Sequence, residues 1–133
     1  MEIDIKTLIS IRSKATSQIS EKEEPVDMLF IISNDNFNMA PVPFQGDFPP
    51  SYKYNARKQA LRAFIAGTAS PQLKYATRLI YCSLDLIYDV DYCFDIDNLT
   101  KEITLYIVKN GNIARRYKNY DVDYDERPDL AQL

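Results

Sequence analysis

An alternation of apolar and polar residues is the feature that most limits how this chain can fold. Every even position from Ile80 to Ile96 is apolar, and most odd positions from Ser83 onward are polar. A repeat of two places alternate side chains on opposite faces of a β-strand, whereas on a helix the same residues would scatter around the axis. We therefore expect a strand with one buried face. Because one strand of this length is too long for such a small domain, we expect a strong bend or a break near residues 88–91.

A second β signal follows in the chain. Asn110 and Gly111 stand between two runs of β-forming residues. Such a pair predicts a hairpin, because a type I′ turn needs positive φ at both central positions. The C-terminal half is therefore predicted to be an antiparallel meander with strands at residues 79–97, 102–109 and 112–119.

Two segments are predicted to be helices that pack on this sheet. Residues 4–20 carry a narrow apolar stripe at helical spacing, and residues 52–66 carry a wider one. Residues 28–32 are predicted to be a short buried strand. The expected fold class is α+β, a small antiparallel β-meander with two packed helices and a long proline-rich arm. We expect a single domain over residues 1–133, with a frayed acidic tail at residues 121–133.

The proline-rich segment at residues 33–51 shows neither a helical nor a strand repeat. It is nevertheless apolar in part, and large apolar side chains are costly to leave in water. Because prolines hinder regular ladder pairing, we expect an extended arm that binds a partner. The alternative, an arm folded back on its own domain, stays open. The predicted partner-binding residues are Phe37, Met39, Phe44 and Phe48.

Composition excludes several kinds of chemistry. The chain has no histidine and three glycines, so catalysis by histidine and a glycine-rich phosphate loop are both excluded. Cys82 and Cys93 are expected to be reduced thiols in the core. The chain begins without the features of a signal peptide, and no apolar run is long enough for a membrane span. An intracellular protein that does not bind membranes is expected.

One short motif resembles that of a known enzyme family. The segment FDIDNLTK at residues 94–101 is similar to the D-x-D-N-L-x-K signature of RusA-like Holliday-junction resolvases. The resemblance implies that Asp95 and Asp97 hold Mg²⁺ at a phosphodiester and that Lys101 is a catalytic or DNA-contacting residue. It also implies a helix after the motif. The alternative is an ordinary turn between two strands, because Asp and Asn side chains satisfy turn backbone.

Charges are segregated along the chain. No acidic residue occurs between Asp47 and Asp85, whereas the helix at residues 52–66 carries several cations. Such a basic face could contact phosphates. The alternative is that these cations face the acidic residues Asp85, Asp89, Asp91, Asp95 and Asp97, within one chain or between subunits. The residues of the predicted basic face are Lys53, Arg57, Lys58 and Arg62.

The tail contains an apparent calcium motif that we reject. Asp121, Asp123 and Asp125 have the spacing of the first three ligands of an EF-hand loop. That loop needs Gly next and Glu at its last position, but the chain has Glu126 and Gln132 there. No metal site is predicted in the tail.

These features favour a non-enzymatic assembly or protein-interaction subunit that forms homo- or hetero-oligomers with other protein subunits and uses no cofactor. A phage virion or another mobile element is one such assembly. Two alternatives stay open. One is an Mg²⁺-dependent nuclease using Asp95, Asp97 and Lys101, and the other is a nucleic-acid-binding adaptor using the helix at residues 52–66. Whether residues 99–109 form a strand or a helix separates the leading interpretation from the nuclease.

Overall fold

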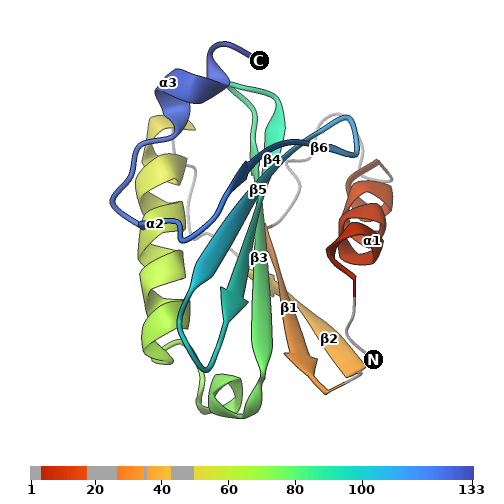
Figure 1. Cartoon of the computed structure of the whole chain (residues 1–133), viewed down its shortest axis with the longest axis vertical. Coiled ribbons are helices and arrows are strands. Elements are labelled where there is room, and N and C mark those ends of the chain that lie inside the picture. Colours follow the sequence, from red (N-terminus) through yellow and green to blue (C-terminus); the bar gives the residue numbers. More distant parts are fainter. Residues whose placement is uncertain (1–3, 18–26, 35, 43–49) are drawn as a thin grey trace.

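The structure, a computed structural model, describes residues 4–17, 27–34, 36–42 and 50–133. These residues form three layers, with an antiparallel sheet between helices α1 and α2, which lie on opposite faces (Figure 1). The α+β class is therefore confirmed. The elements are α1 Ile5–Ser17, β1 Asp27–Ser33, β2 Asn36–Val42, α2 Pro50–Ala66, the 3-10 helix η1 Pro71–Tyr75, β3 Arg78–Asp85, β4 Val90–Asp97, β5 Ile103–Lys109, β6 Asn112–Tyr117 and α3 Arg127–Leu130.

The sheet has six strands in the order β2-β1-β3-β4-β5-β6, and all neighbours are antiparallel. Strands β3 to β6 follow one another directly, which confirms the predicted meander but with four strands instead of three. The long alternating stretch breaks into β3 and β4 at the turn formed by residues 86–89. The hairpin at Asn110 and Gly111 is also present, with φ of 54° and 78°.

The expectation of a strand with one buried face is wrong, because helices cover both faces of the central strands. Ile80 of β3 pairs with Asp95 of β4, so even positions in one strand lie opposite odd positions in the other. The even residues therefore change faces at the turn. Cys82 packs in the cluster that contains α1 residues, whereas Phe94 packs in the cluster that contains α2 residues.

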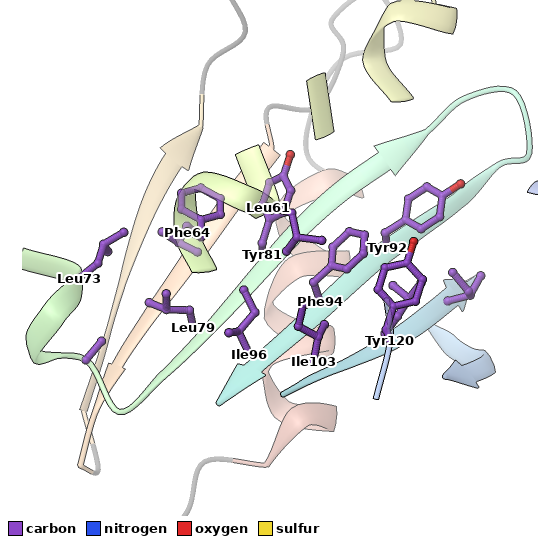
Figure 2. Packing of buried hydrophobic residues seen from close by; sticks show 14 of the residues in the cluster. Leu61, Phe64, Leu73, Leu79, Tyr81, Tyr92, Phe94, Ile96, Ile103 and Tyr120 are labelled. Carbon is purple, nitrogen blue, oxygen red and sulfur yellow. The ribbon is translucent and has the colours of Figure 1, made fainter. Parts of the chain in front are cut away.

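The larger core lies between the sheet and α2 (Figure 2). Leu61 and Phe64 of α2 are buried against a row of aromatic rings from β3 and β4. The Phe94 ring stacks between Tyr81 and Tyr92, with centroid separations of 5.8 and 6.0 Å. Because each large apolar side chain contributes about 1.5–3 kcal/mol when it is buried, this aromatic row is a principal source of stability.

A smaller core lies between α1 and the other face of the sheet. Leu8 and Ile9 of α1 pack there in one cluster with Phe30 of β1. Cys82 and Cys93 lie opposite each other in the same cluster, with their Sγ atoms 3.6 Å apart. Both are buried and free, as predicted.

Residues 36–42 correct the expectation of an arm without ladder pairing. They form β2, which pairs with β1 from Ser33–Asn36 to Asp27–Val42. Because Ser33 and Asn36 close a two-residue hairpin, hydrogen-bonded and non-hydrogen-bonded pairs alternate along the strands, and Pro41 falls in a non-hydrogen-bonded pair. The backbone nitrogen of Pro41 therefore points away from β1, so the missing N–H removes no hydrogen bond between β1 and β2.

The acidic tail also differs from the frayed segment that we expected. Tyr120 and Leu130 are buried in the larger core, and Glu126 is buried beside them. Residues 127–130 form α3. Two apolar anchors and one buried acidic residue therefore fix a segment whose composition suggested solvent exposure.

Candidate functional site

A cleft of about 1110 Å³ opens at the end of the sheet where β3 begins and β4 ends. Its walls come from the start of α1, from η1 and from the turn between β4 and β5. The cleft brings Asp95 and Asp97 of the resolvase-like motif together on one wall, because residues two apart on a strand share a face. The charged residues of its walls are Asp4, Lys74, Arg78, Asp95, Asp97 and Glu102.

Asp95 is paired with an arginine of the neighbouring strand. Arg78 donates from Nε to Oδ1 at 2.8 Å and from Nη2 to Oδ2 at 2.7 Å. Such a two-bond pair occupies both carboxylate oxygens, which are the atoms that would bind Mg²⁺. Among the described residues, no three His, Cys, Asp or Glu side chains are grouped so that they could hold a metal ion. The donor set does not fit the magnesium site that the resemblance implies.

Asp97 and Lys101 belong to the turn between β4 and β5. Asp97 Oδ1 accepts from the backbone N–H groups of Leu99 and Thr100 at 2.9 and 3.2 Å. Lys101 has a φ of 64°, and its Nζ donates to Asn98 Oδ1 at 2.8 Å. These side chains satisfy the turn, as the alternative interpretation of the motif expected.

Two cations of the predicted basic face lie inside the molecule. The Arg57 guanidinium lies 4.1 Å from the centroid of the Tyr92 ring, and its Nε donates to Ser83 Oγ at 2.9 Å. Lys58, the next residue in the sequence, is also buried. Since neither cationic group is on the surface, neither can contact a phosphate in this conformation.

Lys58 joins α2 to the tail through a buried polar network. Its Nζ lies 3.2 Å from Glu126 Oε2 and donates to the Tyr120 hydroxyl, which in turn donates to Glu126 Oε2 at 2.7 Å. Burial lowers the pKa of Lys58, and the nearby carboxylate opposes this change. Burial and the bond to Glu126 raise the pKa of Tyr120. The network therefore fixes the tail against α2.

The other two predicted cations also face acidic residues. Lys53 Nζ lies 3.7 Å from the buried Asp27 Oδ1, and Arg62 Nη2 lies 2.5 Å from Asp123 Oδ1 at the surface. These cations therefore face acidic residues within the chain, as the alternative expected, but not the acidic residues that it named. The acidic partners come from β1 and the tail rather than from the strand residues 85–97.

The four predicted partner-binding residues have different surroundings. Phe37 is half-buried against Phe30 of its own domain, with ring centroids 5.9 Å apart. Met39 is 52% exposed on β2. Phe44 and Phe48 lie outside the described residues. The structure therefore leaves one described apolar side chain of this set largely in solvent.

Sequence reasoning assigned no role to the cations of the last hairpin. Arg115 and Arg116 of β6 and the following Lys118 are exposed. The signal was present, because no acidic residue occurs from Ile103 to Tyr120. The acid-free stretch between Asp47 and Asp85 is longer and gives the stronger basic signal.

Comparisons of the chain with family models, with curated proteins and with solved structures find no match. In the parts of the chain that the structure describes, no helix is long and apolar enough to cross a membrane. Residues 103–109 form strand β5, where the resolvase resemblance implies a helix and the hairpin signal predicts a strand.

Proposed function

We propose that this protein is a non-enzymatic assembly subunit that associates with other protein subunits through the outer edge of β2. The observation that carries the proposal is that β2, within the described residues, is an edge strand paired only with β1. An edge strand presents unpaired N–H and C=O groups, which can add a strand from another chain. On the outer edge of β2 the N–H groups belong to Phe37 and Met39, since Pro41 has none. The proposed setting is intracellular, with a phage virion or another mobile element as one such assembly.

A second copy of the chain is the first partner to test. Residues 36–42 carry no charge, so two β2 edges can approach each other around a two-fold axis without repulsion between like charges. Pairing of two edges would also place Met39 of each copy near the contact. Heterologous subunits with an uncharged edge strand satisfy the same requirements.

The alternation of pairs along β2 gives a selective test. Met39 falls in a non-hydrogen-bonded pair with Phe30, so its N–H points away from β1, whereas that of Asn38 points toward β1. Met39→Pro should therefore remove self-association in analytical ultracentrifugation and leave the fold intact. The matched control, Asn38→Pro, should instead lower the melting temperature. A wild-type protein that stays monomeric at every concentration, or association that survives Met39→Pro, would contradict the proposal.

A further inference from the structure

The β5–β6 hairpin carries cations for which the described part of the chain shows no acidic partner. Two surface arginines elsewhere in the described chain form ion pairs, Arg62 with Asp123 at 2.5 Å and Arg127 with Asp125 at 2.7 Å. Among the described residues, no ion pair involves the cations of the hairpin. They are Lys109, Arg115, Arg116 and Lys118. This concentration of positive charge is notable in a chain with a net charge of −3, and it predicts an anionic partner.

The two arginines of β6 point to opposite faces of the sheet. Arg115 pairs with Ile107, which packs in the α2-side core, and Arg116 pairs with Tyr106, which packs in the α1-side cluster. Side chains of directly opposite residues share a face, so neighbouring residues of β6 present one cation on each side of the sheet edge. The Arg116 guanidinium lies 5.8 Å from the centroid of the Tyr106 ring, which agrees with this placement.

The backbone of β6 is also accessible. This strand is the second edge of the sheet, and its residues from Asn112 to Arg116 are exposed. An edge of this kind can receive a further strand, whose own side chains would alternate between the same two faces. Self-pairing of two β6 edges is disfavoured, because it would bring like charges together.

We propose that the β6 edge binds an extended acidic segment of a partner protein as an added strand. Neighbouring acidic residues of that segment would lie beside Arg115 on one face and Arg116 on the other. A nucleic acid is the less suitable occupant, because a groove wall or a flat phosphate surface meets only one of the two arginines. This second interface lies at the opposite edge of the sheet from β2, so its test is independent of the first proposal.

The test uses a short fluorescein-labelled peptide of Thr and Val with neighbouring Glu and Asp at its centre. Binding is measured by fluorescence anisotropy at low and physiological salt. Arg115→Glu with Arg116→Glu should weaken binding about tenfold, because two surface charge attractions become repulsions. The control Lys6→Glu with Lys74→Glu makes the same change in net charge at exposed positions outside the hairpin, and it should leave the affinity unchanged. Circular dichroism checks the fold of each variant.

Backbone pairing is tested separately from charge. Two versions of the peptide carry N-methyl groups on alternate residues, one version for each edge of the peptide strand. One of the two should lose binding, because only one edge of an added strand pairs with β6. The proposal is overturned if both versions bind as well as the parent peptide, if the Lys6 and Lys74 control weakens binding equally, or if single-stranded DNA binds more tightly than the peptide.

Discussion

Removal of the Lys58 ammonium tests how the tail is fixed. Lys58 and Glu126 form a 3.2 Å ion pair with side chains only 6% and 0% exposed. Lys58→Met keeps the apolar stem and leaves a carboxylate buried without its cation. Breaking a buried pair in this way costs about 3–5 kcal/mol, a large part of the 5–15 kcal/mol that is typical of a whole domain.

A double variant separates loss of the pair from loss of packing. Lys58→Met with Glu126→Gln removes both charges of the pair, and the Gln side chain can still accept from Tyr120. We therefore expect the double variant to be more stable than Lys58→Met alone, with a coupling energy of about 2–3 kcal/mol in a double-mutant cycle. The measurement is the free energy of unfolding from urea denaturation.

The chain offers a matched control on the same helix. Arg62 and Asp123 also join α2 to the tail, but their side chains are 46% and 78% exposed. Arg62→Met should change the free energy of unfolding by less than about 1 kcal/mol, because exposed pairs contribute little. A Lys58→Met variant that costs no more than this control would refute the argument that the buried network fixes the tail.

Four further outcomes are expected. Gly111→Val should cost about 1–3 kcal/mol in urea denaturation, because φ of 78° strains a β-branched residue; an unchanged midpoint would contradict this. Burial raises the pKa of Asp27 above 3.8, so the stability that this group contributes is present below pH 3.8 and is lost as the pH rises through the raised pKa. The difference in unfolding free energy between the wild type and Asp27→Asn should therefore fall as the pH rises through this range, and a difference that does not change with pH would contradict the prediction. Calorimetry should detect no Mg²⁺ binding at Asp95, because an arginine occupies both oxygens of this carboxylate; Mg²⁺ binding by the wild type that Asp95→Asn abolishes would contradict this. Cys82 and Cys93 should react slowly with hydrogen peroxide in the folded protein, because both thiols are buried and the contact with Cys82 and burial raise the pKa of Cys93; rapid loss of two hydrogens from the tryptic peptide that contains both would contradict this.

Local signals in the sequence predicted α1, α2, β1 and the last hairpin, but not β2 or α3. Asn110 and Gly111 specify their turn through their own backbone preferences, so the hairpin needs no information from the rest of the chain. The buried faces of β3 and β4 could not be obtained in this way. They depend on the register between the two strands, and the pairing of Ile80 with Asp95 exchanges the faces of even and odd positions.

The environment of the candidate site residues was hidden for a similar reason. The sequence alone suggests that Lys58 is a surface cation, but the fold places Glu126, 68 residues further along the chain, beside it. Pro41 reads as a residue that hinders pairing until β2 is known to be an edge strand. The sequence suggests that Asp95 and Asp97 are metal ligands, but Arg78 occupies both oxygens of Asp95 and turn N–H groups bind Oδ1 of Asp97. In each case the deciding contact is one that the local sequence does not contain.

The order of strands along the chain has a consequence for folding kinetics. Strands β3 to β6 are joined by short turns, so their pairing requires little loop-closure entropy. The pairing of β1 with β3 instead closes a long loop, because α2 and β2 lie between them in the chain. Contacts between segments that are close in the sequence form fastest, so the β3–β6 meander should already be formed in the transition state for folding. The hairpin of β1 and β2 should dock afterwards, and newly synthesised chains would expose the flank of β3 until it does.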